Sequence, residues 1–123
     1  MINELAKEVH QNSKNHGFFD SEKNIGEMLA LIHSEVSEAL ECDRKDKYFK
    51  KLQLPLKNYE QLPDQTFQVQ FSNDVKDTFE DELADIMIRV MDLAAFKGVN
   101  LEQHIKAKMR FNALREHKHG KKY

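Results

Sequence analysis

The sequence predicts an all-α fold, a bundle of four helices with an irregular insertion at about residues 46–75. Three observations lead to this class. Only four Gly and two Pro occur in 123 residues, fewer than a turn-rich β protein needs. Four segments place apolar side chains three or four residues apart, the period of an amphipathic helix. The length is that of one domain, so we expect residues 1–123 to form a single domain.

The first two helices follow from this apolar spacing and from residues that favour helix ends. The first is predicted over residues 2–15 and ends at the pair His16–Gly17. The second is predicted over about 25–45, where Asn24 precedes the helix as its N-cap. Two consecutive amphipathic segments of this length are typical of a helical bundle.

The second half of the chain contains the insertion and two further helices. Residues 46–75 hold both prolines and no helical stripe, and Thr66–Phe71 alternates apolar and polar side chains, as a short strand does. The third helix is predicted over about 76–97 and stops at Gly98. The fourth begins after Asn100, which is expected to cap it.

The charge of the chain is unevenly distributed, although the net charge is only −2. Residues 106–123 carry seven Lys or Arg and one acid, which leaves twelve basic and twenty acidic side chains in the other 105 residues. A basic end on an acidic body can bind nucleic acid, can meet the phosphates of a cation-bridged polyphosphate, or can simply be a solvated terminus. The charge pattern alone leaves all three interpretations open.

Several classes of protein are excluded by what the chain lacks. Its first residues contain no apolar stretch flanked by basic residues, and no run approaches the roughly 18 apolar residues of a membrane span. The single cysteine, Cys42, excludes an internal disulfide framework and a zinc site built from several cysteines. We therefore expect a cytoplasmic protein without a membrane partner.

Two pairs of acids, three residues apart, lie beside the apolar stripes that we expect to pack inward. Glu35 and Glu38 belong to the second helix, and Glu82 and Asp85 to the third. Carboxylates near a core repel one another and lose hydration unless a cation joins them. Oxygen ligands suit Mg²⁺ or Mn²⁺. The alternative is that these acids are solvated, with Arg89 acting only as the helix partner of Asp85.

These residues carry a resemblance to a known family. Glu35-Val36-Ser37-Glu38 and Glu82-Leu83-Ala84-Asp85, followed by the basic end KMRFNALREHKHGKKY, resemble the motifs of the MazG-like nucleotide pyrophosphohydrolases, an all-α superfamily. The acid pairs are separated by residues 39–81, a longer connection than the family usually has. The insertion is therefore a candidate lid, base pocket or subunit interface.

The resemblance implies an enzyme activity and its metal ligands. MazG-like proteins hydrolyse nucleoside triphosphates between the α and β phosphates, releasing nucleoside monophosphate and pyrophosphate. It implies that Glu35, Glu38, Glu82 and Asp85 bind Mg²⁺, with Mn²⁺ as a substitute, and that Glu35 is the catalytic general base. The place of Glu35 at the apolar edge of its helix independently favours a raised pKa, which suits such a base.

The resemblance also implies substrate contacts and an oligomer. Lys108, Asn112 and Arg115 follow one face of the fourth helix, where they would bind phosphate or sugar; the alternative is an ordinary polar helix face. A core completed by dimerisation is expected, in a homodimer or a dimer of dimers. The competing interpretation is a catalytically inactive protein that senses nucleotides, or one that binds nucleic acid through the basic C-terminal helix. The acidic body counts against nucleic acid as a partner.

Overall fold

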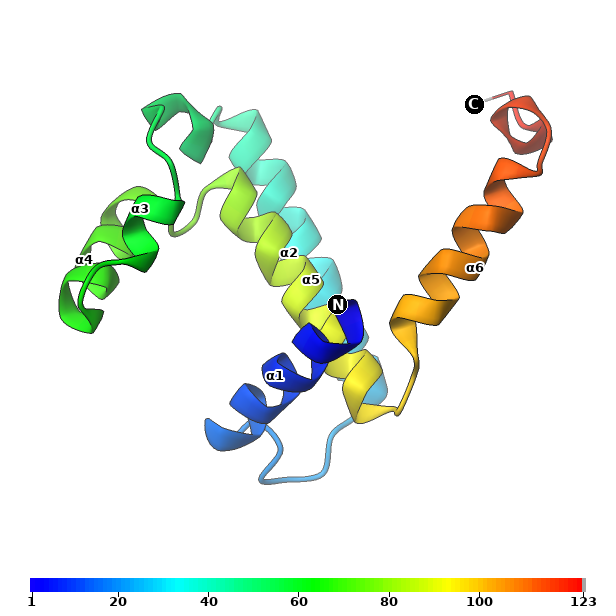
Figure 1. The fold of residues 1–123 in the computed structure, drawn as a ribbon, viewed down its shortest axis with the longest axis horizontal. Helices are drawn as coiled ribbons and strands as arrows, with labels where there is room; N and C mark the ends of the chain where they lie inside the picture. The colour runs from blue at the N-terminus through cyan, green and yellow to red at the C-terminus, as the bar shows by residue number, and fades with distance from the viewer. Residues whose placement is uncertain (123) are drawn as a thin grey trace. The chain divides into compact units, whose positions relative to one another are not determined.

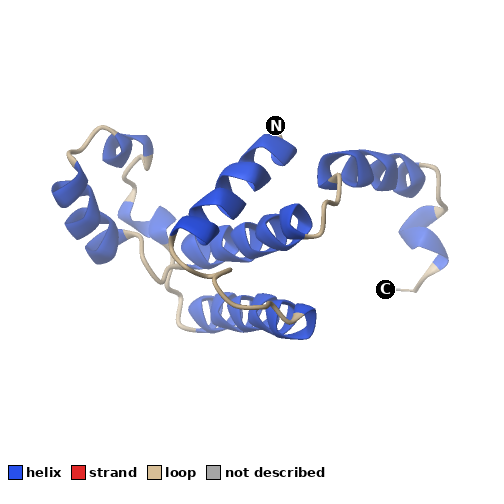
Figure 2. Ribbon diagram, turned by 90° about the horizontal axis from the view of Figure 1, so that it is seen from below, coloured by secondary structure: helices blue, strands red, loops and turns tan. Residues whose placement is uncertain are grey.

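In a computed structural model of the chain, residues 1–122 are described, apart from the side chains of His117 and His119. Within that range all regular structure is helical and no strand occurs, which confirms the all-α class (Figure 2). None of the helices in this range combines the length and apolarity needed to cross a bilayer. In chain order the helices are α1 (Ile2–Asn15), α2 (Ile25–Arg44), the 3-10 helix η1 (Phe49–Leu52), α3 (Lys57–Glu60), α4 (Asp64–Asp74), α5 (Phe79–Phe96), α6 (Leu101–Ala113) and the 3-10 helix η2 (His117–Gly120) (Figure 1).

The helix ends expected from the sequence are present in the structure. The side-chain oxygen of Asn24 accepts a hydrogen bond from the backbone N–H of Glu27 at 3.2 Å, and Asn100 accepts one from Gln103 at 3.2 Å. Each cap satisfies an N–H that the first turn of a helix leaves without a partner. Gly98 follows α5 with a φ of +67°, a left-handed conformation that ends the helix.

The prediction of an irregular insertion with a strand was wrong. Residues 46–75 contain η1, α3 and α4, and the segment Thr66–Phe71 lies inside α4. Its alternating apolar residues also fit a helix, because Phe67 and Phe71 are one turn apart and share a face. Their rings lie 5.5 Å apart, whereas Val69, the apolar residue between them, is 59% exposed.

A small aromatic cluster holds the insertion together. Phe49, Tyr59 and Val75 are buried at its centre, and the Tyr59 hydroxyl donates a hydrogen bond to Asp74 at 2.7 Å. Helices α3 and α4 lie side by side around the cluster (Figure 1). The insertion is therefore a helical subdomain with its own apolar contacts. Three partly buried side chains complete the packing: Leu62, Phe67 and Phe71.

The start of α5 fixes the first part of the insertion. The Glu80 carboxylate accepts hydrogen bonds from the backbone N–H groups of Phe49 at 2.9 Å and Lys50 at 2.7 Å. The backbone N–H of Phe79 in turn donates to the carbonyl of Lys47 at 2.9 Å. Side-chain and backbone bonds thus hold η1 against the first turn of α5.

The chain forms two compact units. The first is residues 23–89, which contain α2, the insertion and the first part of α5. The second combines residues 1–22 with 90–123, which contain α1, the end of α5 and α6. Each unit has buried side chains of its own.

In the second unit, α1 is attached to the end of α5 by polar and aromatic contacts. Asp92 accepts hydrogen bonds from Ser13 at 2.9 Å and pairs with the His10 ring at 2.8 Å. The His10 ring also meets Phe19 edge-on at 4.7 Å, and Phe19 lies 4.9 Å from Phe96. The residues that follow α1 therefore fold back over it.

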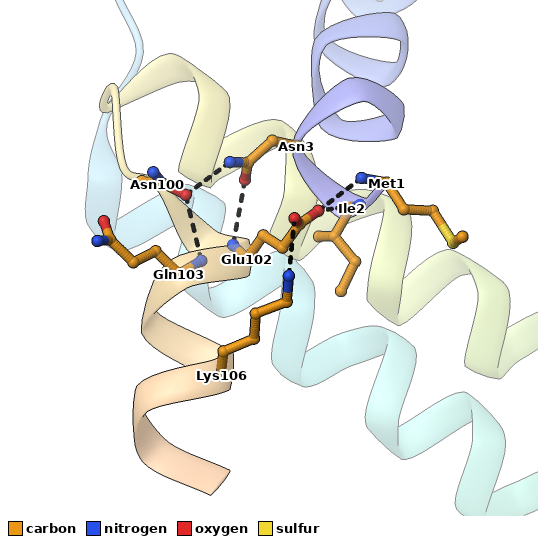
Figure 3. A network of polar contacts seen from close by, with 7 residues as sticks. All are labelled: Met1, Ile2, Asn3, Asn100, Glu102, Gln103 and Lys106. Atoms are coloured by element: carbon orange, nitrogen blue, oxygen red, sulfur yellow. Dashed lines mark hydrogen bonds and ion pairs between the residues drawn. The ribbon is translucent and has the colours of Figure 1, made fainter. Parts of the chain in front are cut away.

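The N-terminus is tied to the first turn of α6 (Figure 3). One Glu102 oxygen accepts hydrogen bonds from the Met1 ammonium and the Ile2 backbone N–H, both at 2.7 Å. Asn3 donates to the Asn100 side chain at 2.6 Å and accepts from the backbone N–H of Glu102 at 3.1 Å. The hydrogen bonds from the terminal ammonium and from Ile2 lower the pKa of Glu102 to about 2.

The apolar stripes of α2 and α5 face outward more than the sequence suggested. On the buried side of α2 lie Met28, Glu35, Ala39 and Cys42, so Glu35 belongs to that side and not to its edge. No large side chain among the described residues is completely buried. One chain therefore leaves much of the apolar surface of both helices open. The exposed apolar side chains are Leu29, Leu31, Val36 and Leu40 of α2 and Leu83, Met87 and Ile88 of α5.

Candidate metal centre

Helices α2 and α5 bring three of the four predicted metal ligands together. One carboxylate oxygen from each of Glu35, Glu38 and Glu82 lies within 4.8 Å of the other two. Glu35 is 7% exposed and Glu82 is 4% exposed, whereas Glu38 reaches the group from the exposed side. The spacing of three residues places Glu35 and Glu38 on one face of α2. The group opens to solvent on the side of Glu38.

Glu82 is the member of this group whose ionised form is disfavoured most strongly. Its burial, the hydrogen bond it shares with Glu35 and the charge of Glu38 together raise the pKa of Glu82 to about 7. Its Oε2 atom is buried and has no hydrogen-bond partner in the described chain. A buried carboxylate oxygen without a hydrogen-bond partner normally lowers the stability of the folded protein unless a cation or a donor reaches it.

Glu35 has the opposite shift, which corrects the expectation of a raised pKa. Its burial does raise the pKa, but hydrogen bonds from Arg89 and Glu38 outweigh that effect, so the pKa of Glu35 lies below its usual value. Arg89 donates from Nε to Oε1 of Glu35 at 2.8 Å. The carboxylate of Glu35 is therefore ionised at neutral pH.

Glu38, the exposed member of the group, and Asp85, outside it, also have raised pKa values. The hydrogen bond with Glu35 and the charge of Glu35 raise the pKa of Glu38. Asp85, the fourth predicted ligand, lies one turn after Glu82 and outside the group of three oxygens. Burial and the charges of Asp81 and Glu35 raise the pKa of Asp85, so its carboxyl group is within electrostatic range of the group.

The predicted substrate-binding residues lie in the other unit. Lys108 and Asn112 belong to α6, and Arg115 follows its end. The Lys108 ammonium lies 4.8 Å from the centre of the Phe111 ring, and the Arg115 guanidinium lies 5.5 Å from it. The side-chain oxygen of Asn112 is buried without a recorded hydrogen bond in the described chain. Two cations thus lie near one aromatic ring of the α6 segment.

The donor set of the acidic group fits a hard divalent cation. Three carboxylates supply only oxygen, which Mg²⁺ and Mn²⁺ prefer, and the buried Oε2 of Glu82 is an acceptor still without a partner. A cation between the three groups would offset their mutual repulsion. Glu35, Glu38 and Glu82 are the residues that would hold it, with Asp85 one turn away.

Sequence reasoning missed the connection between Arg89 and Glu35. Arg89 follows Asp85 by four residues, and this spacing suggested a pair within α5. It also follows Glu82 by seven residues, so it shares the face of Glu82 that meets α2. That second spacing is the signal that pointed to a contact across the two helices.

Comparisons with known protein families, with characterised proteins and with solved structures return no match to this chain. Any assignment of function therefore rests on the motifs and on the geometry of the acidic group.

Proposed function

We propose that this protein is a Mg²⁺-dependent nucleoside triphosphate pyrophosphohydrolase, which cleaves its substrate between the α and β phosphates to give nucleoside monophosphate and pyrophosphate. The observation that carries the proposal is the group formed by Glu35, Glu38 and Glu82, with its buried unpartnered oxygen. The resemblance of both acid motifs to those of MazG-like proteins supports the same reaction. The substrate class follows from the resemblance.

The acidic residues bind the cation in this proposal. Glu35 and Glu38 contribute from α2, and Glu82 from α5. Asp85, one turn after Glu82, is the proposed fourth ligand. When bound, Mg²⁺ neutralises phosphate oxygens and makes a water more acidic. Mn²⁺, which takes the same oxygen ligands, is the expected substitute.

Glu35 is the proposed catalytic residue. It orients the attacking water and accepts its proton. Its lowered pKa keeps it ionised at neutral pH, so it can always accept a proton, although it is a weaker base than a residue with a raised pKa. The hydrogen bond from Arg89 fixes the orientation of the carboxylate, which a positioned acceptor requires.

The α6 segment supplies the proposed phosphate contacts. Lys108 and Arg115 bring positive charge close to the Phe111 ring, and charge-assisted hydrogen bonds to phosphate are strong. Asn112 is the proposed contact for sugar or phosphate through its side-chain amide, whose oxygen is buried without a hydrogen-bond partner in the described chain. These residues would hold the triphosphate or the leaving pyrophosphate.

The protein is also proposed to act as a homodimer or a dimer of dimers. Leu29 and Leu40 of α2 and Leu83 of α5 are between 45% and 50% exposed, although they lie on long amphipathic helices. Large apolar side chains exposed on the stripe of an amphipathic helix are typical of a face that another protein covers. A second copy of the chain is the proposed partner.

The proposal is tested by incubating the purified protein with Mg²⁺ and a panel of ribo- and deoxyribonucleoside triphosphates, with the products separated by chromatography. Glu38→Gln is the variant that removes a ligand from the exposed side, and Glu41→Gln is the matched control. Glu41 is an exposed acid of α2 that pairs with Lys45 at 3.3 Å and does not belong to the acidic group. We expect monophosphate and pyrophosphate from the wild type and the control, and at least about a hundredfold lower rate from Glu38→Gln.

Other products would identify a different function. Diphosphate with inorganic phosphate would contradict cleavage between the α and β phosphates. Mg²⁺-dependent nucleotide binding without turnover would favour a nucleotide sensor. Binding of nucleic acid that weakens steeply with salt, without nucleotide turnover, would favour the basic C-terminal helix as a nucleic-acid-binding element.

A further inference from the structure

Arg89 is a basic residue that contacts the acidic group directly. It lies on α5, two turns after Glu82, and its Nε donates to Glu35 Oε1 at 2.8 Å. The Glu35 side chain is 10% exposed and the Arg89 side chain is 40% exposed. The contact therefore joins a buried carboxylate to a guanidinium that reaches solvent.

Only one edge of the guanidinium takes part in this bond. A guanidinium has five N–H donors in a planar fork, and the recorded bond uses the one on Nε. In the described part of the chain no hydrogen bond is recorded for the two terminal nitrogens of Arg89, and no ion pair joins Arg89 to Asp85. Four N–H donors thus remain available at the exposed end of a side chain whose inner edge is fixed.

The charges of the group indicate what those donors would meet. Three carboxylates would surround a bound cation, and one guanidinium contacts them. A divalent cation together with Arg89 would bring three positive charges to the three carboxylates of the group, with Asp85 as a further negative charge one turn away. The cation would therefore weaken the repulsion of an anion, and the parallel N–H groups of a guanidinium match two oxygens of a phosphate.

We infer that Arg89 is a substrate-binding residue: Glu35 orients its guanidinium, and the terminal N–H groups bind the pyrophosphate part of the substrate beside the cation. This role rests on the proposed function for the identity of the substrate, whereas the contact with Glu35 is independent of it. A simpler role would be that Arg89 only neutralises Glu35. The two roles differ in what the loss of Arg89 does to phosphate binding.

The experiment measures binding and not turnover, by titration calorimetry of Mg²⁺-pyrophosphate into the full-length protein in excess Mg²⁺. Arg89→Met removes the donors, and Arg89→Lys keeps the charge but not the planar fork. Arg44→Met is the matched control, because Arg44 is an exposed arginine in the last turn of α2, more than two turns beyond Glu35. Circular dichroism of each variant confirms that it remains folded.

We expect Arg89→Met to weaken pyrophosphate binding about tenfold or more, Arg89→Lys to weaken it less, and Arg44→Met to leave it unchanged. Mg²⁺ affinity, titrated separately, should stay equal or rise in Arg89→Met, because a competitor for Glu35 has been removed. Pyrophosphate affinity within twofold of the wild type in a folded Arg89→Met would overturn the inference, and so would a wild type that does not bind pyrophosphate. A wild type that binds pyrophosphate through Arg89 but releases no pyrophosphate from nucleotides would reject the proposed function and retain the role of Arg89.

Discussion

Glu35 and Glu82 place carboxylate oxygens within 4.8 Å of each other, yet their pKa values shift in opposite directions. The difference arises because Arg89 donates a hydrogen bond to Glu35, whereas Oε2 of Glu82 is buried without a partner. In the metal-free protein the two groups therefore behave as one ionised and one protonated carboxyl at slightly acidic pH. Occupation by a cation would remove the reason for the raised pKa of Glu82.

Stability of the metal-free protein should fall as the pH rises. The pKa of Glu82 is raised from 4.5 to about 7, so between these values the native state holds a proton that the unfolded chain has lost. The free energy of unfolding then decreases through this window, by about 2 to 3 kcal/mol from this group. Urea denaturation at pH 5, 6, 7 and 8 in the presence of EDTA measures the slope. Glu82→Gln, which cannot ionise, should reduce the change of the free energy of unfolding with pH, whereas Glu41→Gln should show the same change as the wild type. Equal slopes in all three proteins would show that Glu82 is not responsible.

Mg²⁺ should stabilise the folded protein at pH 8. A cation that binds only the native state at one hundred times its Kd contributes about 2.7 kcal/mol. We expect the Tm of the wild type to rise on adding Mg²⁺ and to return to its starting value on adding EDTA, measured by differential scanning calorimetry. Glu38→Gln should lose most of the increase and Glu41→Gln should keep it. An increase of the same size in both variants would place the cation elsewhere.

The sequence predicted the long helices and most of their ends, because those depend on local interactions; the exception is α5, which begins at Phe79 and not at about residue 76. Asn24 and Asn100 cap their helices through contacts three residues along the chain, and Gly98 ends α5 by its own conformation. The segment Thr66–Phe71 was mispredicted because alternating apolar residues fit a strand and a helix face equally. What decides between them is the packing of Phe67 and Phe71 in the aromatic cluster, and this depends on distant residues.

The acidic group was only partly predictable for the same reason. The spacing of Glu35 and Glu38 places both on one face of α2, and the second acid motif predicted Glu82 and Asp85 of α5 as their partners. How deeply each carboxylate is buried depends on the packing of two helices that are far apart in sequence. The contact of Arg89 with Glu35 spans 54 residues, and this contact reversed the expected pKa shift of Glu35.

The helical register of α4 gives a mutational test that a strand would fail. In a strand, Phe67, Val69 and Phe71 share one face, whereas in α4 the two phenylalanines pack together and Val69 is exposed. Phe71→Ala should lower the free energy of unfolding by about 2 kcal/mol, because Phe71 is partly buried, and Val69→Ala by less than about 0.5 kcal/mol. Urea denaturation of both variants measures the difference. Comparable losses in the two would favour the strand.

The network around Glu102 should contribute stability that disappears in acid. The hydrogen bond from the terminal ammonium, together with that from Ile2, lowers the pKa of Glu102 to about 2, below its value of 4.5 in an unfolded chain. Its contribution is complete above pH 4.5 and is lost as the pH falls from there towards 2. Glu102→Gln should reduce the Tm at pH 6 and weaken its dependence on pH between 4.5 and 2.5. Glu4→Gln, in the first turn of α1, is the control. If the Tm of Glu102→Gln depended on pH between 4.5 and 2.5 as strongly as that of the wild type, Glu102 would not be the residue responsible.

A second copy of the chain should cover the exposed apolar face of α2. Leu40 is 50% exposed on this face, so covering its exposed half would gain about 1 kcal/mol, roughly half of what burying a fully exposed leucine gains. Light scattering after size exclusion should give the wild type twice or four times its monomer mass of 14.5 kDa. Leu40→Asp puts a charge into the contact and should shift the protein to the monomer at micromolar concentration. Val69→Asp, at an exposed position on α4, should keep the mass of the wild type. A wild type that is already monomeric would show that no second copy covers this face.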